Sequence, residues 1–246
     1  MPKVTVLLPV YNSEKYIKES IDSILAQSFT DWDMLILNEY GSSEKCTDIV
    51  KEYEKKDARI RVIQNAKRLG LAESLNLGIR EATGEYIARM DADDISRKDR
   101  FQKEVDFLNR NPNVAVVGSY QHHFGVDIDW IHKPATEPAQ CKCNAAFFCD
   151  LCHSTLMLRK STFIENNLYY DNTYLAEDFE LWSRVIDFGD IANIPEVLGE
   201  YRVGEDNITL EKKSKLHLES GRIVAKTLKR NIGLELSDEE SALFDN

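Results

Sequence analysis

Three carboxylates fall within four consecutive positions, where Asp91, Asp93 and Asp94 follow the apolar segment "YIARM". Like charges this close repel one another and call for positive charge nearby. In an extended chain, Asp91 and Asp93 point the same way because side chains alternate along it. Such a pair suits a hard divalent cation, Mg²⁺ or Mn²⁺, that completes its shell with water and phosphate oxygens. The structural alternative is that Asp94 and Ser96 cap the following helix, which requires only one of the acids.

The segments around these acids alternate between apolar runs and amphipathic stretches. We expect strands over 4–10, 33–38, 60–64, 85–90 and 114–119, and helices from Ser13 to 25 and over 44–56, 72–82 and 97–110. Unbroken apolar runs such as "VTVLLPV" are typical of parallel strands covered on both faces. The alternation predicts an α/β fold with a mostly parallel central sheet flanked by helices.

The pattern changes after residue 120. "HSTLML" (153–158) indicates a strand, 177–188 an amphipathic helix, and 207–246 a charged helical tail. We expect one domain over 1–206, with a Rossmann-like nucleotide-binding half at 1–120 and a more irregular half at 121–206. Ligands of open parallel sheets bind beyond the carboxyl ends of the strands. Asn12, Glu39 and the acids at 91–94 all follow predicted strands, so we expect them at one edge.

Charge and hydropathy limit the function classes. The net charge of -11 argues against a nucleic-acid partner, which needs a basic face, but a bound metal ion can still attract a phosphorylated ligand. The first residues, "MPKVTVLLPVYN", lack the pattern of a signal peptide, and no run approaches the roughly 18 apolar residues of a membrane span. We expect a cytoplasmic protein; peripheral attachment to the inner face of the membrane stays open, as does the oligomeric state.

Four of the five cysteines, and His153, lie in "CKCNAAFFCDLCH". CxC and CxxC spacings suggest zinc, and CxxCH suggests a c-type haem, which requires export. Structural zinc sites more often use two knuckles separated by a loop. We favour free thiols in a largely buried helix.

Three blocks of the chain resemble family 2 glycosyltransferases of the bacterial type, which have the GT-A fold. They are "VTVLLPVYNSEKYIKESIDSILAQSFTDWDMLIL", "NAKRLGLAESLNLGIREATGEYIARMDADD" and "YLAEDFELWSRV". The resemblance covers roughly residues 3–206. It implies inverting, metal-dependent hexosyl or N-acetylhexosaminyl transfer from a nucleotide-diphosphate sugar, by default a UDP-sugar, to a hydroxyl of a carbohydrate or lipid-linked acceptor. The products would belong to cell-surface polysaccharide or glycolipid synthesis.

The resemblance also implies roles for the acids. Asp93 and Asp91 form the DxD motif and would hold Mn²⁺ or Mg²⁺, with Asp91 near the metal or the ribose. Asp178 matches the catalytic base, and Glu177 is the competing candidate. Both lie in the first turn of a predicted helix, where the dipole favours an ionised acid, although acids are common there for stability alone.

The donor pocket implied by the resemblance draws on several segments. Tyr11 would stack on the base or, alternatively, pack on the next helix. The expected donor contacts are Pro9, Tyr11, Asn12, Glu39, Lys67 (or Arg68), Asn76, Asp91 and Arg100. Arg89 and Arg100 bracket the acids and would neutralise spare charge or contact phosphate; an ordinary salt bridge to Asp94 or Asp99 is the alternative for both. His153 would line the acceptor or diphosphate side, or be a buried structural histidine.

Two departures from the family pattern concern the donor and the metal. Family members usually have Asp-Asp-Gly-Ser after the second strand, where this chain has "NEYGS", so Glu39 is one methylene longer and Tyr40 looks inserted. Many members carry a histidine near the metal where this chain has Gly204. Either water or another residue would then fill that ligand position.

Two other functions compete with glycosyl transfer. A sugar nucleotidyltransferase would have a glycine-rich phosphate loop after the first strand, and "PVYNSEKY" has no glycine. A degenerate nucleotide-sugar-binding protein without turnover would explain "NEYGS" and Gly204. The retained DxD and Asp178 argue against it.

Overall fold

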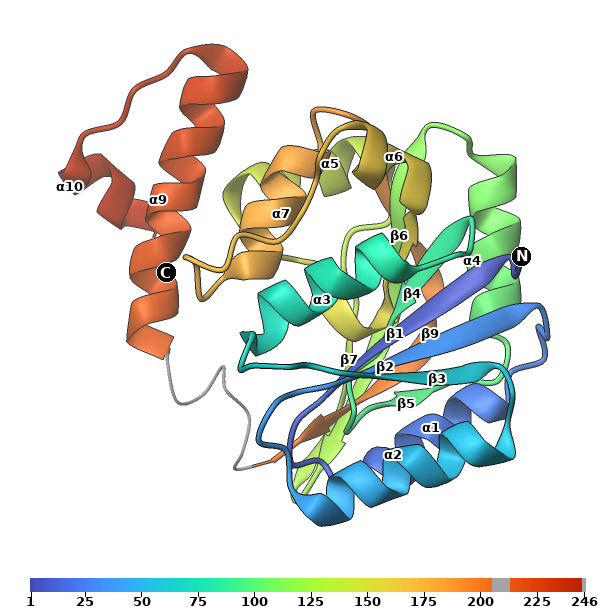
Figure 1. The fold of residues 1–246 in the computed structure, drawn as a ribbon. Coiled ribbons are helices and arrows are strands. Elements are labelled where there is room, and N and C mark those ends of the chain that lie inside the picture. Colours follow the sequence, from blue (N-terminus) through green and yellow to red (C-terminus); the bar gives the residue numbers. More distant parts are fainter. Residues whose placement is uncertain (205–212, 245–246) are drawn as a thin grey trace.

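The structure, a computed structural model, describes residues 1–204 and 213–244, and within them one curled sheet of nine strands (Figure 1). The strand order is β3-β2-β1-β4-β8-β6-β9-β5, and β7 pairs with β6. The strands are β1 (Val4–Val10), β2 (Trp32–Asn38), β3 (Ile60–Gln64), β4 (Tyr86–Arg89), β5 (Ile95–Ser96), β6 (Val114–Gly125), β7 (Ile128–His132), β8 (Met157–Arg159) and β9 (Asp190–Val203).

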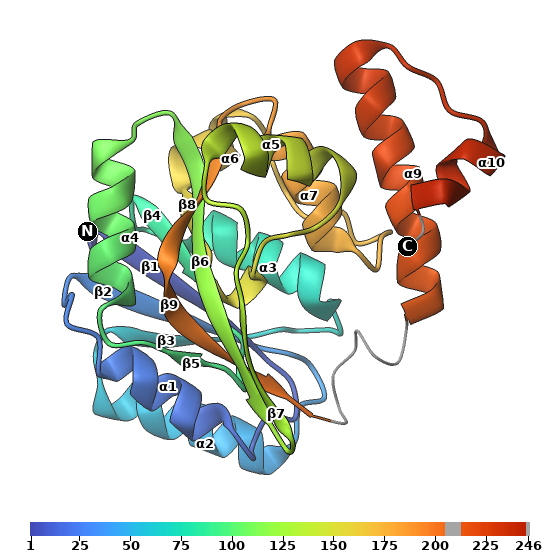
Figure 2. The ribbon, with the colours of Figure 1, turned by 180° about the vertical axis from the view of Figure 1, so that it is seen from behind.

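Helices cover both faces of this sheet (Figures 1 and 2). They are α1 (Ile17–Leu25), α2 (Glu44–Lys56), α3 (Gly70–Glu81), α4 (Arg100–Arg110), α5 (Pro138–Phe147), α6 (Lys160–Glu165), α7 (Glu177–Val185), α9 (Lys213–Ile232) and α10 (Asp238–Ser241), with short 3₁₀ turns η1 (His153–Thr155) and η2 (Ala242–Phe244). One apolar core lies between the sheet and α1, α2 and α4, and a second between the sheet and α3, α5, α6 and α7. Both faces of β1 and β2 are therefore buried, which explains their continuous apolar sequences.

The parallel half confirms the predicted architecture. Strands β3, β2, β1 and β4 run parallel, and Val10 pairs with Asn38, which pairs with Gln64. The carboxyl ends of β1, β2 and β3 therefore end level with one another. β4 ends three pairs earlier, since its last residue Arg89 pairs with Leu7, and the acidic segment then continues along the same edge.

The second half departs from the sequence prediction. Residues 153–158 do not form one strand: η1 comes first, and β8 begins only at Met157. β6 continues to Gly125 and pairs with β7 and with the long β9. Sequence reasoning missed β7, β9 and the outer part of β6 because segments such as "YQHHFG" carry no apolar run.

The tail packs against α7. Side chains of α9 and of the start of α7 form a third apolar cluster that contains Ala176, Phe179, Ile223, Val224 and Leu228. The carboxylate of Glu219 accepts hydrogen bonds from the backbone N–H groups of Leu175 (2.6 Å) and Ala176 (3.0 Å). A domain boundary after residue 206, like positions 207–212 and 245–246 of the tail, lies outside the described residues.

Candidate active site

The acidic segment leaves β4 beside a buried arginine. Arg89 is 4% exposed, and its guanidinium forms an ion pair with Asp91. The backbone carbonyl of Asp91 accepts a hydrogen bond from Ser20 Oγ at 2.8 Å, which fixes the turn against α1. Arg89 Nε is buried and has no hydrogen-bond partner. The first acid of the cluster is thus neutralised in part by the preceding strand.

The other two acids have fewer donors. Burial and the charge of Asp91 raise the pKa of Asp93 to about 6. Asp94 is 1% exposed; its Oδ1 accepts from the backbone N–H of Arg202 at 3.0 Å, while its Oδ2 has no hydrogen-bond partner. Burial and the charges of Asp91 and Asp93 raise the pKa of Asp94 well above its usual range. The charges of Arg89 and Arg202 lower the pKa of Asp93, but they do not offset burial and the repulsion among the three acids.

A second pair of acids begins α7. Asp178 Oδ1 accepts from the backbone N–H of Phe179 at 2.7 Å, and Cys149 Sγ lies 3.6 Å from Asp178 Oδ2. Burial raises the pKa of Asp178 above its usual value, against the opposing effects of that N–H and of Arg89. Burial and Asp178 likewise raise the pKa of Glu177 to about 7. The expectation that the helix terminus favours the ionised acid is thus corrected, because burial outweighs it.

Arg89 lies between the two groups of acids. Its charge lowers the pKa of Asp178 and Glu177 as well as pairing with Asp91. Sequence reasoning expected Arg89 to neutralise spare charge, to contact phosphate or to form an ordinary salt bridge, and it did not link Arg89 to the acids of α7. The available signal was a cation inside the apolar strand "EYIARM", where a charge must have a partner.

His153 closes the same region from η1. Its Nε2 lies 2.8 Å from the hydroxyl of Tyr170, and its ring contacts those of Tyr170 and Trp182. Burial and Arg89 hold the pKa of His153 well below its usual value, so the imidazole is neutral. The predicted place near the diphosphate or acceptor and the structural alternative are both compatible with this position.

The chemistry of the acids suits a divalent metal. Mg²⁺ and Mn²⁺ need only one or two protein carboxylates, with the remaining oxygens supplied by water and phosphate. Asp91 and Asp93 are such donors, and the unpartnered Oδ2 of Asp94 shows that negative charge here is under-compensated. Within residues 1–204 and 213–244, no three His, Cys, Asp or Glu side chains converge into a metal site of their own. The ligand shell would therefore depend on the substrate.

Glu39 has a different position from the one expected. It is 7% exposed, and its carboxylate accepts from the backbone N–H groups of Tyr40 (2.7 Å), Leu69 (3.1 Å) and Gly70 (2.6 Å). Burial opposes ionisation, but these donors hold the pKa of Glu39 below its usual value. The carboxylate fastens the start of α3 to the end of β2. The carboxylate thus has a structural role, and its expected hydrogen bond to a base stays a prediction.

Two asparagines are also used by the backbone. Asn76 donates to the carbonyl of Tyr170 and accepts from its N–H, both at 2.8 Å, so its expected turn toward the base is not observed. Asn12 has a left-handed backbone (φ 51°), and its Oδ1 accepts from the N–H of Ser43 at 2.8 Å. Asn12 therefore joins the loops that follow β1 and β2.

Three predicted donor contacts remain available at the strand ends. Tyr11 is 42% exposed, and the guanidinium of Arg68 lies 4.8 Å from the centre of its ring. Lys67 is exposed beside it, and Pro9 is half-buried within β1. Tyr11 is therefore partly exposed beside Arg68, and its stacking on the base stays a prediction.

Arg100 does not contact the site in the way expected. It is 0% exposed, and its guanidinium binds Glu104 (3.0 Å) and the carbonyls of Arg89 (2.9 Å) and Ser154 (2.9 Å). Its donors are occupied, so neither a phosphate contact nor an ion pair with Asp94 or Asp99 occurs. Arg100 instead holds the backbone of β4 against η1.

The cysteines are free thiols in the structure. Cys141 and Cys152 are buried, whereas Cys143 and Cys149 are exposed. Only Cys141 and Cys143 lie in α5; the other two flank the loop that reaches Asp178. The expectation of one buried helix is therefore correct only for Cys141.

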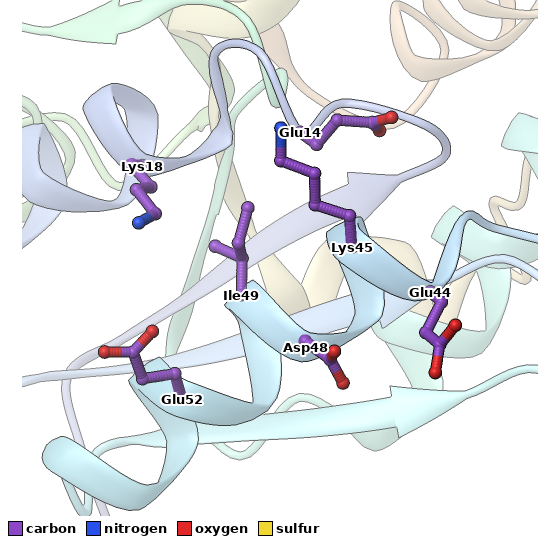
Figure 3. A pocket seen from close by; sticks show the side chains of 7 residues that line it. All are labelled: Glu14, Lys18, Glu44, Lys45, Asp48, Ile49 and Glu52. Carbon is purple, nitrogen blue, oxygen red and sulfur yellow. The ribbon is translucent and has the colours of Figure 1, made fainter.

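A shallow hollow also lies between α1 and α2 (Figure 3). It is lined by side chains of both charges, Glu14, Lys18, Glu44, Lys45, Asp48, Ile49 and Glu52. These helices cover the face of the sheet opposite α7. The hollow therefore belongs to neither group of site acids.

Curated relatives of this chain are glycosyltransferases. An uncharacterized glycosyltransferase of Haemophilus influenzae is 33% identical over 217 residues, which are 82% of this chain and 66% of that protein. The putative glycosyltransferase EpsE of Bacillus subtilis is 34% identical over 244 residues, 96% of this chain and 85% of EpsE. The putative teichuronic acid biosynthesis glycosyltransferase TuaG of Bacillus subtilis is 29% identical over 86% of this chain and 83% of its own length.

Solved structures share the fold. TarS 1–349 of S. aureus, in complex with UDP-GlcNAc, superposes with a TM-score of 0.76 at 18% identity, over 97% of this chain and 69% of that one. The mannosyltransferase PcManGT of Pyrobaculum calidifontis, with GDP-Man and Mn²⁺, gives 0.69 at 17% identity, over 99% and 68%. Residues 5–179 match the family model described as "Glycosyl transferase family 2". The chain belongs to this family of glycosyltransferases and has the GT-A fold predicted from its sequence.

Proposed function

We propose that the protein transfers a hexosyl or N-acetylhexosaminyl group from a nucleotide-diphosphate sugar to an acceptor hydroxyl, with inversion at the anomeric carbon. The observation that carries this proposal is the meeting of two acidic groups around Arg89. Asp91 and Asp93 follow β4, and Glu177 and Asp178 begin α7. A donor bound at the strand ends would have its diphosphate near the first group and its sugar toward the second.

Asp178 acts as the general base in this proposal. Its carboxylate takes the proton of the acceptor hydroxyl while that oxygen forms the new bond to the anomeric carbon. The bond from this carbon to the diphosphate oxygen breaks in the same step, and the nucleoside diphosphate leaves with the electron pair. A raised pKa makes Asp178 a stronger base than an exposed aspartate, and the hydrogen bond from Phe179 orients it.

Asp91 and Asp93 would hold a divalent cation, Mn²⁺ or Mg²⁺. When bound, the cation stabilises the negative charge that develops on the departing diphosphate. Arg89 keeps Asp91 oriented from the buried strand. In this proposal Tyr11, Arg68 and Lys67 contact the nucleotide and its phosphates, which the contact between Arg68 and the exposed ring of Tyr11 supports.

The comparisons support a role in surface polysaccharide synthesis. The name of TuaG refers to teichuronic acid, and the two structures contain UDP-GlcNAc and GDP-Man. We therefore propose a UDP-sugar as the default donor, GDP-mannose as the alternative, and a carbohydrate or lipid-linked acceptor. No helix in the described residues has the length and apolarity to cross a bilayer. A cytoplasmic location is part of this proposal.

Replacing the base tests the mechanism. Asp178→Asn should lower the rate of sugar transfer at least 1,000-fold, because proton removal is lost. Binding of UDP and Mn²⁺, measured by calorimetry, should change less than threefold, since the side chain keeps its shape. Glu177→Gln serves as the matched comparison and should keep most of the rate. A near wild-type rate for Asp178→Asn, with a large loss for Glu177→Gln, would transfer the role of base to Glu177.

Nucleotide release by the wild-type protein tests turnover itself. UDP-GlcNAc and GDP-mannose should each be incubated with and without Mn²⁺, and released nucleoside diphosphate measured. Slow, Mn²⁺-dependent hydrolysis of one donor is expected. Binding without any release would support the degenerate nucleotide-sugar-binding protein instead.

A further inference from the structure

The hairpin of β6 and β7 and the adjoining end of β9 form the lower end of the sheet in Figure 2. A row of aromatic rings crosses these three strands. His123 on β6 pairs with Trp130 on β7 and with Tyr201 on β9. Its ring centroid lies 4.1 Å from that of Trp130 and 4.9 Å from that of Tyr201. His132 adjoins them, 6.0 Å from both His123 and Trp130. We call these four side chains the aromatic row.

The aromatic row shares its sheet face with residues that contact the active site. Gln121 lies two residues before His123 on β6. Its side chain donates to Ser154 Oγ at 2.7 Å, next to His153. His132 Nε2 lies 3.5 Å from Asp150 Oδ1. The residue before Asp150 is Cys149, whose thiol contacts Asp178. The row therefore continues the candidate active site on the side of α7 rather than of α1.

Arg202 covers part of the opposite face of the hairpin, where Ile131 of β7 is 45% exposed. Phe124 and Arg202 alternate with the row, and the guanidinium of Arg202 lies over Phe124 (4.6 Å) and over Tyr16 of the segment leading into α1 (4.3 Å). In the row itself, Trp130 is 48% exposed. Burial and the neighbouring His132 and His122 lower the pKa of His123 to about 4, so its ring is uncharged at neutral pH. This face thus presents the exposed Trp130 and the uncharged His123, both with polar ring edges.

We propose that the aromatic row binds the acceptor glycan, with a pyranose ring stacked on the exposed Trp130, which His123 supports from within the row. The C–H groups on one face of a pyranose are apolar, and they suit the negative face of an aromatic ring. The indole N–H of Trp130 and the imidazole nitrogens of the row supply partners for sugar hydroxyls at the ring edges. This inference rests on the proposed function, because a sugar held here leads toward Asp178.

A membrane surface is the other occupant that exposed aromatic rings could suggest. The turn of the hairpin carries Asp127, and β7 carries Asp129. These acids, with a net charge of -11 for the chain, would be repelled by anionic lipid headgroups. The observations therefore favour a neutral glycan over a lipid surface.

Direct binding tests the row without turnover. Cellotetraose, chitotetraose and α-1,6-mannotetraose should be titrated into the full chain, with affinity followed by protein-observed NMR. At least one should bind the wild type, and Trp130→Ala should weaken that binding at least tenfold. Trp130→Phe should restore it to within threefold. The matched control is Ile131→Ala, since Ile131 is 45% exposed but points to the opposite face of β7, and its affinity should equal that of the wild type.

Three results would overturn the proposal: no binding of any of the three sugars, equal binding by Trp130→Ala with a preserved circular dichroism spectrum, or equal losses in Trp130→Ala and Ile131→Ala. Co-sedimentation with phosphatidylglycerol vesicles that is lost in Trp130→Ala would also overturn it, in favour of a membrane contact. Donor hydrolysis by the wild type is measured separately. Its absence counts against the proposed transfer reaction, whereas sugar binding by the row is decided by the titration alone.

Discussion

Glu39 and the pair Asp93 and Asp94 lie at the same edge of the sheet, but they differ in how many hydrogen bonds their carboxylates accept. Glu39, after β2, accepts from three backbone N–H groups, and its pKa lies below the usual value. After β4, Asp94 accepts from one backbone N–H, that of Arg202, and its Oδ2 has no partner; burial and the neighbouring acids raise the pKa values of Asp93 and Asp94. The protein itself supplies hydrogen-bond donors to the carboxylate of Glu39. A bound cation would supply the charge compensation that Asp93 and Asp94 have only in part.

The contrast shows which buried acids indicate function. Burial alone does not, since Glu39 is nearly as buried as Asp94 and only fastens a loop. Carboxylates held together without donors cost stability, and proteins keep such arrangements mainly where a ligand or a reaction uses them. Glu177 and Asp178 belong with Asp93 by this criterion.

The largest expected effect is on metal binding by Asp93. Asp93→Asn should weaken Mn²⁺ binding in the presence of UDP at least 100-fold, because it removes an anionic ligand. Electron paramagnetic resonance of free Mn²⁺ measures this without turnover. Asp99→Asn is the control, an exposed aspartate paired with Lys103 outside the cluster, and should bind Mn²⁺ as the wild type does. Equal affinity in Asp93→Asn would place the metal elsewhere.

A smaller effect, on the free energy of unfolding, is expected when the charge of Glu39 is removed. Glu39→Gln should lower the free energy of unfolding by about 2 kcal/mol at pH 7, because charge-assisted bonds to the start of α3 are weakened. The pKa of Glu39 is lowered in the folded state, so its stabilising contribution is present at neutral pH and lost as the pH falls through that lowered value. Urea unfolding of both proteins at pH 7 and pH 3 measures the difference, which should shrink at pH 3. A constant difference would exclude the charge as its cause.

The smallest effect should have the opposite sign. Glu177→Gln should raise the free energy of unfolding by about 1 kcal/mol at pH 8, because ionised Glu177 is destabilised by burial and by Asp178. A carboxyl with a folded-state pKa of about 7 favours folding below pH 4.5, and this advantage is lost as the pH rises through 7. The two proteins should therefore have equal stability near pH 4.5. A Glu177→Gln protein less stable than the wild type at pH 8 would contradict the contrast with Glu39.

The sequence predicted the parallel half well because its signals are local. Apolar runs marked β1, β2, β3 and β4, and strand ends located the acids. The donors that each polar group uses depend on distant segments: Asn76 binds the backbone of Tyr170, and Arg100 reaches η1. The hairpin of β6 and β7 was missed because its exposed, polar strands have no apolar periodicity. Family resemblance supplied the role of Asp178, which charge and spacing alone left open.

The packing of α9 on α7 bears on how the protein can be shortened. The family match ends at residue 179, yet Glu219 supplies the acceptor for the amides of Leu175 and Ala176. A protein shortened to the matched segment would lose Glu219, so the N–H groups of Leu175 and Ala176 would lose their hydrogen-bond acceptor. It would also expose Phe179, the residue after the proposed base Asp178. A shortened or fused version of this enzyme should therefore keep α9, because α9 supports the start of α7, where the proposed base lies.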